Sequence, residues 1–179
     1  MVLIPPHQLT TDRLVLRPTS VLDADRAFEI QSAWEVTRML RMASFPPSRE
    51  EIVDWFADHP REWATGEAYR FGVELRGRLI GVVDIDDIGQ EEGELGYWFD
   101  QETWGQGYAS EAAKAVVRFA FCDVGLQRLR SGHAVDNRAS ASVLLKLGFR
   151  PRDIVQRMSR SRGEEIMQRR YILASPDSV

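Results

Sequence analysis

The stretch from Leu95 to Phe121 constrains the fold more than any other part of the sequence. A strand-like aromatic segment (95–99) leads into a short loop, and Gly105 and Gly107 then precede a segment with helical periodicity. The first turn of a helix has unpaired N–H groups and the positive end of the helix dipole, so it attracts anions. Glycines remove the Cβ atoms that would keep a phosphate away from those groups. The stretch therefore predicts a strand, a phosphate-binding loop and a helix.

Three interpretations of this loop differ in what it binds. A glycine-rich turn at the start of a helix needs no ligand at all. A dinucleotide-binding loop would have a third glycine where Ser110 stands, and its glycines would follow the strand directly, whereas residues 100–104 intervene here. The third interpretation, a loop that binds the pyrophosphate of acetyl-CoA, depends on a family resemblance described below.

The rest of the chain predicts a mixed sheet. Seven segments have strand-like patterns: 11–18, 70–75, 78–84, 95–99, 126–135, 152–161 and 164–173. The helix between the fourth and fifth segments forms a crossover, so these two strands should be parallel, whereas the hairpins make the others antiparallel. The expected fold class is α/β (α+β), with a mainly antiparallel seven-stranded sheet and helices on both faces.

Length and composition limit the class of protein. The 179 residues fit one domain, predicted over residues 1–174 with a loose tail at 175–179. The only cysteine, Cys122, is predicted to lie in the core and excludes an internal disulfide. No Cys/His cluster has metal-ligand spacing, and no segment is apolar enough to span a membrane. A net charge of −4 disfavours nucleic acid as a partner. The composition therefore predicts a cytoplasmic protein without a metal or membrane partner.

A second pattern lies about thirty residues after the glycine loop. Asn137 can cap a helix, Ser140 follows it by one helical turn, and the helix should end at Gly148. By itself this pattern predicts only a capped helix with an apolar stripe facing the core.

Together the two patterns resemble the GNAT superfamily of N-acetyltransferases, in particular its RimJ/RimL-like group of ribosomal-protein N-acetyltransferases. Gly96-Tyr-Trp followed by Trp104-Gly-Gln-Gly-Tyr-Ala-Ser-Glu-Ala is similar to the pyrophosphate loop of that group. Asn137-x-x-Ser followed by Lys146-x-Gly-Phe is similar to its second motif. The resemblance covers nearly the whole chain. It implies the GNAT-like acyl-CoA N-acyltransferase fold and the transfer of an acetyl group from acetyl-CoA to an amine.

The resemblance also implies which residues bind the acetyl-CoA cosubstrate. The strand at 95–99 would present backbone groups to the pantetheine amides where the two parallel strands separate, and the Asn137 side chain would hydrogen-bond the same arm. The predicted cofactor-binding residues are Tyr97, Phe99, Trp104, Gly105, Gln106, Gly107, Tyr108, Ala109, Ser110, Asn137 and Lys146.

The catalytic groups are predicted less completely. An ammonium must lose a proton before it attacks a thioester, and the departing thiolate benefits from an acid. The resemblance implies Ser140 as that acid, whereas the tyrosine and glutamate of many relatives are replaced by Leu144 and Gly132. Glu94 is the best remaining carboxylate for the base, with His133 or no base at all as alternatives.

The acceptor is predicted only as an amine. An acidic run is expected to attract a cation beside the site, and it consists of Asp84, Asp86, Asp87, Glu91, Glu92 and Glu94. A protein N-terminus, a polyamine and an amino-sugar antibiotic all fit this scaffold, and a homodimer is compatible with it. A protein that holds CoA without turnover is the alternative from a different class.

Overall fold

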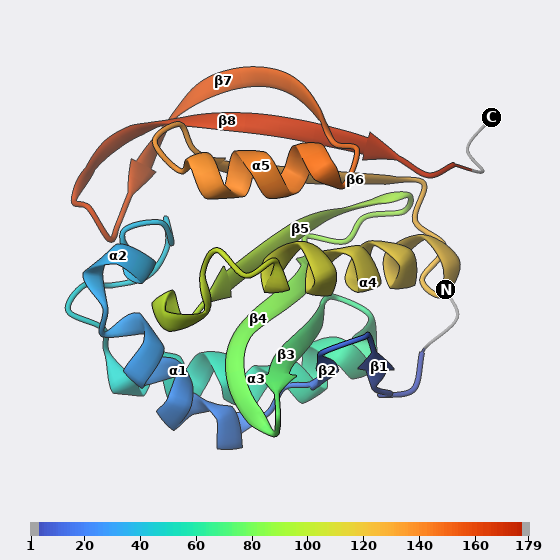
Figure 1. Ribbon diagram of the computed structural model, residues 1–179, viewed down its shortest axis with the longest axis horizontal. Helices are drawn as coiled ribbons and strands as arrows, with labels where there is room; N and C mark the ends of the chain where they lie inside the picture. Colours follow the sequence, from blue (N-terminus) through green and yellow to red (C-terminus); the bar gives the residue numbers. More distant parts are fainter. Residues whose placement is uncertain (1–3, 177–179) are drawn as a thin grey trace.

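The computed structural model describes residues 4–176, which form an eight-stranded sheet in the order β1-β2-β3-β4-β5-β6-β8-β7 (Figure 1). The strands are β1 (Leu9–Thr10), β2 (Val15–Pro18), β3 (Tyr69–Leu75), β4 (Arg78–Asp86), β5 (Glu92–Phe99), β6 (Arg128–Ala134), β7 (Arg150–Ser159) and β8 (Glu164–Ala174). The pair β5–β6 is parallel, and the other neighbouring pairs are antiparallel. The predicted mixed, mainly antiparallel sheet is therefore confirmed.

The sheet has one strand more than the seven predicted from the sequence. The additional strand, β1, has two residues and pairs with β2 through Leu9 opposite Leu16 and Thr10 opposite Val15. Two residues are too few to show an alternating pattern, so nothing in the sequence distinguishes this edge strand from a loop. The predicted strand count was wrong for this reason, and the fold class is unchanged.

Five α-helices and two short 3₁₀ helices connect the strands within the described part of the chain. They are η1 (Val21–Asp23), α1 (Ala24–Gln31), α2 (Trp34–Thr37), α3 (Arg49–Thr65), η2 (Gln101–Thr103), α4 (Tyr108–Cys122) and α5 (Arg138–Lys146). None of the helices in residues 4–176 is long and apolar enough to cross a membrane.

The helices cover both faces of the sheet, as predicted. On one face α1 and α3 pack against Val82 of β4 and Trp98 of β5. On the other face α4 and α5 lie side by side (Figure 1), and Phe119 and Leu144 from these helices join the larger core with Phe99. Because successive side chains of a strand point to opposite faces, Val82 and Val83 of β4 contribute to different cores.

Two predictions concern positions near the ends of elements. Ser175 is buried, and its N–H donates a hydrogen bond to the carbonyl of Gln127 at 2.8 Å, so the predicted tail begins with a residue attached to the sheet. Residues 177–179 of that tail lie outside the described residues. Cys122 is exposed at the end of α4, so its predicted place in the core was wrong.

Candidate functional site

The two parallel strands separate in the middle of the sheet. Their pairing ends where Glu94 of β5 lies opposite Arg130 of β6. The next residue of β6, Ser131, bridges the widening gap with its side chain, whose hydroxyl donates to the carbonyl of Leu95 at 2.8 Å. Beyond this point β5 presents main-chain groups that β6 does not pair.

The hydrogen-bond register shows which groups face this gap. The N–H of Asp100 donates to the carbonyl of Ile80 at 2.7 Å, so these two residues face each other across β4 and β5. Antiparallel pairs alternate, and the main-chain groups of Tyr97 and Phe99 therefore point away from β4 and into the gap. The indole N–H of Trp104 donates a hydrogen bond to the Phe99 carbonyl at 3.0 Å, so this carbonyl already has a partner. The predicted backbone role of this strand fits the geometry best at Tyr97.

The glycine loop has the backbone conformation of an anion-binding helix start. Gly105 and Gly107 have φ values of 74° and 81°, a region that glycine occupies without strain. Gly107 is the N-cap of α4 and provides no side-chain cap, and the first bond of the helix runs from the N–H of Glu111 to its carbonyl at 3.1 Å. The N–H groups of residues 108–110 precede that bond, so they have no partner inside the helix.

The glycines are needed for conformation more than for space. A Cβ atom at Gly105 would meet nothing within 4 Å, and one at Gly107 would lie 3.4 Å from a guanidinium nitrogen of Arg13. Arg13 also donates to the carbonyl of Gln106 at 2.9 Å and pairs with Glu111 at 2.7 Å. This arginine therefore holds the loop against the start of α4. Nothing in the sequence predicts its role, because the contacts span more than ninety positions.

A cavity of about 550 Å³ lies between α4 and α5 and extends along β5 to the gap. It brings together residues from both sequence motifs: Tyr97, Phe99, Trp104, Gly105, Gly107, Tyr108, Ala109, Ser110, Asn137, Ser140 and Lys146. Gln106 is not among the lining residues, and its side chain donates to the carbonyl of Glu102 at 3.4 Å instead. Ten of the eleven predicted cofactor-binding residues thus surround one cavity, together with the predicted acid.

The start of α5 places three polar groups beside this cavity. The Asn137 side chain accepts a hydrogen bond from the N–H of Ser140 at 3.1 Å, so the predicted cap is confirmed. The Tyr97 hydroxyl donates to the carbonyl of Ser140 at 3.4 Å, and burial raises the pKa of this phenol to about 12. No hydrogen bond within residues 4–176 engages the Ser140 hydroxyl. The sequence did not predict that the Tyr97 side chain would reach this helix.

Leu144 and Gly132 stand where many relatives have an acid and a base, and both positions are closely surrounded. Leu144 is fully buried in the core. A Cβ atom at Gly132 would lie 2.9 Å from the side-chain nitrogen of Gln168 and 3.2 Å from the carbonyl of Arg169. Leu144 is therefore a packing position, and a side chain at position 132 would have to displace Gln168.

The two roles of Asn137 can be separated by substitution. Asn137→Ala is expected to lower the free energy of unfolding by ~1 kcal/mol through loss of the cap, and also to weaken CoA binding. Asn137→Asp keeps an oxygen for the cap but loses the amide donor, so it should weaken CoA binding alone. Urea unfolding and calorimetric CoA titration measure the two effects. Equal CoA affinity of the Asp variant and the parent would leave Asn137 with only a structural role.

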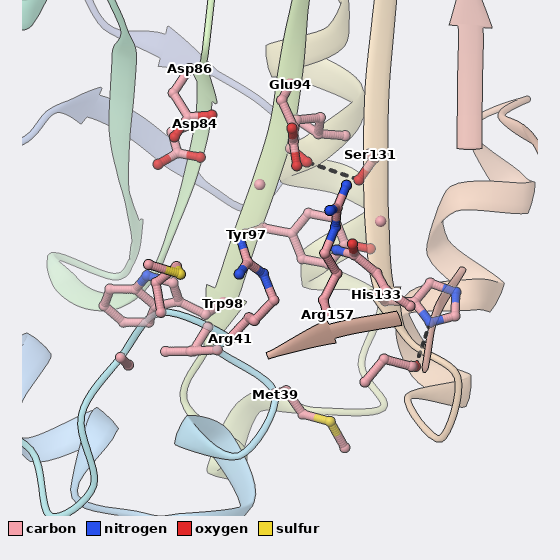
Figure 2. A pocket seen from close by; sticks show the side chains of 18 of the residues that line it. Met39, Arg41, Asp84, Asp86, Glu94, Tyr97, Trp98, Ser131, His133 and Arg157 are labelled. Carbon is pink, nitrogen blue, oxygen red and sulfur yellow. Dashed lines mark hydrogen bonds between the residues drawn. The ribbon is translucent and has the colours of Figure 1, made fainter. Parts of the chain in front are cut away.

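A second and larger cavity, about 900 Å³, opens on the face that carries α3 (Figure 2). It shares three groups of lining residues with the first cavity: 95–98 of β5, 131–133 of β6, and Met39 and Leu40 after α2. The two cavities therefore meet at the gap between the strands, beside the segment that follows α2.

Glu94 lines the second cavity at the point where the strands begin to separate. Burial raises the pKa of its carboxyl above the usual value, Asp86 acts in the same direction, and Arg130 opposes them. The nearest Arg130 nitrogen is 3.6 Å from the carboxylate, a loose ion pair that leaves the other oxygen open to the cavity. The predicted base therefore lies beside the gap with a pKa shifted toward neutrality.

Asp84 is a functional candidate that the sequence placed only within the acidic run. It is buried, and its carboxylate lies 2.5 Å from a nitrogen of Arg70. A Cβ atom at Gly96 would lie 2.7 Å from a carboxylate oxygen, so this glycine makes room for Asp84 on β5. Burial raises the pKa of Asp84, and the neighbouring Arg70 opposes that shift.

His133 has the surroundings of a structural histidine. Its Nδ1 lies 2.7 Å from the carbonyl of Ala134, which can only accept, so Nδ1 carries the proton. Its Nε2 lies 3.0 Å from the Tyr171 hydroxyl, and burial lowers its pKa. With both nitrogens engaged, His133 is a poor alternative to Glu94 as the base.

Comparisons with known proteins agree with this geometry. Residues 13–150 match a family model described as an acetyltransferase (GNAT) domain. The chain is 30% identical over 172 residues to the uncharacterized N-acetyltransferase YoaA of Bacillus subtilis (strain 168). That alignment covers 94% of this chain and 97% of YoaA. It is 34% identical over 86 residues to the ribosomal-protein-serine acetyltransferase of Escherichia coli (strain K12), an alignment that covers 47% of this chain and 48% of that enzyme.

A solved structure shows the same fold. RimL, a ribosomal L7/L12 alpha-N-protein acetyltransferase in complex with coenzyme A, aligns with a TM-score of 0.84 at 19% identity over 94% of this chain and 98% of its own. The chain belongs to the GNAT family of acetyltransferases, so it is an acetyltransferase enzyme. The predicted similarity to the RimJ/RimL-like group is confirmed by these relatives.

Proposed function

We propose that this enzyme transfers the acetyl group of acetyl-CoA directly to a primary amine, and that the amine is the N-terminal α-amine of a protein. The observation that carries the proposal is the meeting of two cavities at the gap between β5 and β6. One cavity has the helix start and open backbone groups that suit a pyrophosphate and a pantetheine arm. The other admits an acceptor from the opposite face of the sheet.

The reaction needs four groups, and the chain offers each near the gap. The amine nitrogen attacks the thioester carbon after giving a proton to Glu94, directly or through a water. Main-chain N–H groups of β5 beside Tyr97 stabilise the negative oxygen of the tetrahedral intermediate. The carbon–sulfur bond then breaks, and Ser140 gives its hydroxyl proton to the departing thiolate. The nitrogen loses its second proton in the same step, and this proton returns to the serine oxygen directly or through water. No covalent enzyme intermediate is required.

The relatives support the choice of acceptor. A ribosomal-protein-serine acetyltransferase is 34% identical over part of the chain, and RimL shares the fold over most of it. CoA was bound in the RimL structure, and a second structural neighbour was solved with acetyl-CoA. Cytoplasmic location and a homodimer stay predictions.

Gly107→Val tests the proposed cofactor site. A residue with a Cβ atom loses ~1–2 kcal/mol in the left-handed conformation, so the start of α4 should distort and CoA affinity should fall roughly tenfold. Gly77 in the β3–β4 turn has a similar φ of 78° and open space around it, which makes Gly77→Val the matched control. Calorimetric titration should show weak CoA binding only for Gly107→Val. If both folded variants bind CoA with equal affinity, the glycine loop is not part of the cofactor site.

Thiol release from acetyl-CoA with a panel of amines and N-terminal peptides tests the reaction itself. Acetylated product identified by mass spectrometry supports the proposal. CoA binding without acetylation of any amine would make the chain a binding module.

A further inference from the structure

The cavity proposed for the acceptor is not acidic, although the whole chain has a net charge of −4. Its charged lining residues are five carboxylates and seven arginines: Glu51, Asp84, Asp86, Asp87, Glu94, Arg41, Arg70, Arg130, Arg152, Arg157, Arg160 and Arg170. The expectation that an acidic run attracts a cationic amine therefore does not describe this surface. The arginines outnumber the carboxylates inside an otherwise acidic protein.

Two arginines contact five of the six carboxylates of the acidic run, all except Glu91. Arg70 contacts Asp84 at 2.5 Å and Asp86 at 3.3 Å. On the other side of the cavity, Arg130 contacts Asp87 at 2.7 Å and Glu94 at 3.6 Å. Because Arg70 also pairs with Glu62 and Arg130 with Glu92, these contacts offset part of the negative charge near the gap.

Three lining arginines form no ion pair within residues 4–176: Arg41, Arg152 and Arg157. Two of them, Arg41 and Arg157, lie on the same wall of the cavity. Arg41 donates to the carbonyl of Met158 at 3.3 Å, which places it beside the strand segment that carries Arg157. Figure 2 shows both side chains extending into the cavity on the side of Tyr97 and Trp98. The wall therefore presents two unpaired guanidinium groups to whatever occupies the cavity.

We propose that the acceptor carries an anionic group, a carboxylate or a phosphate, in addition to its amine, and that Arg41 and Arg157 bind this group. The inference rests on the proposed acetyl transfer and specifies its acceptor. A guanidinium binds carboxylate or phosphate oxygens through two parallel N–H donors, with stronger hydrogen bonds than neutral groups form. With the anion on this wall, the amine at the other end of the acceptor lies near Glu94 and the gap. Polyamines, which have only positive charges, do not fit such a surface.

Matched acceptors separate this inference from the proposed function. The kcat/KM for phosphoethanolamine is compared with that for ethanolamine. In the second pair, a peptide beginning Ser-Asp-Glu is compared with one beginning Ser-Asn-Gln. Spermidine is included as an acceptor that carries only positive charge. The first pair tests a small acceptor and the second an acidic protein N-terminus. The anionic member of at least one pair is expected to have a kcat/KM roughly tenfold higher or more. Equal values in both pairs, or a preference for spermidine, would overturn the inference and leave acetyl transfer intact. Failure to acetylate any amine would overturn both.

Substitution of the two arginines assigns the effect to this wall. In Arg41→Gln and Arg157→Gln the KM of the preferred anionic acceptor should rise roughly tenfold, and the preference over its neutral partner should largely disappear. Arg157→Lys keeps the charge but not the paired donors, so it should recover only part of the preference. Arg78, exposed at the start of β4 and outside the cavity, provides the control Arg78→Gln. Folded glutamine variants that keep the full preference would show that another surface selects the acceptor.

Discussion

Ser140→Ala is expected to lower kcat about 10²–10⁴-fold, the usual contribution of a single general acid, while acetyl-CoA binds nearly as tightly as to the parent. The serine lines the cofactor cavity one turn into α5, and Asn137 already caps that helix. No hydrogen bond of the described residues engages the hydroxyl, so its loss should change the free energy of unfolding little. Single-turnover acetyl transfer, CoA titration and urea unfolding measure the three quantities.

The control for this experiment is Ser142→Ala, the same chemical change two residues further along α5. Ser142 lines the same cavity, so this variant separates a proton donor from a serine that only lines the cavity. Its kcat should stay close to that of the parent. If Ser140→Ala has the same kcat as Ser142→Ala and the parent, Ser140 is not the acid. The Tyr97 hydroxyl, which reaches the same turn of α5, would then be the next group to replace.

Glu94→Gln is expected to cause the second large loss, about 10²–10⁴-fold in kcat/KM at neutral pH, with recovery as the pH rises. A base must be ionised to accept a proton. Burial raises the pKa of Glu94, so the parent should lose activity as the pH falls through that raised value. The glutamine variant has no such group, and its rate should rise with pH only because more of the acceptor amine is deprotonated.

The matched control is Glu92→Gln on the same strand. Glu92 pairs with Arg130 at 3.2 Å, as Glu94 does more loosely, but it does not line the cavity. Its pH–rate curve should follow that of the parent. Parallel curves for Glu94→Gln and the parent would exclude Glu94 as the base. Asp84 would then be the stronger candidate, because His133 has both nitrogens engaged.

Local patterns determined most of the fold. Several features depend only on residues within a few positions of one another, so they could be predicted. They are the helical period after Gly107, the cap at Asn137 and the hairpin turns at Gly77 and Gly163. The parallel pair β5–β6 followed from the crossover between them. Only the two-residue strand β1 was missed, because its pairing depends on β2 and not on a pattern of its own.

The residues proposed to bind the cofactor could be placed from the sequence more fully than those proposed to bind the acceptor. The proposed cofactor residues lie in two continuous motifs, at the end of β5 through the start of α4 and at the start of α5, and the fold brings those motifs to one cavity. Gln106 does not line that cavity, because its side chain donates to the carbonyl of Glu102 and its own carbonyl accepts from Arg13.

The tertiary structure alone decided the charge of the acceptor cavity. In the sequence, residues 84–94 form an acidic run, which predicts that negative charge is concentrated there. In the fold, Arg70 and Arg130 pair with that run, whereas Arg41 and Arg157 come from distant segments and form no ion pair within residues 4–176. Sequence shows which charges neighbour one another along the chain. Electrostatic interactions depend on distance in space, so the character of a cavity built from many segments is fixed only when those segments pack together.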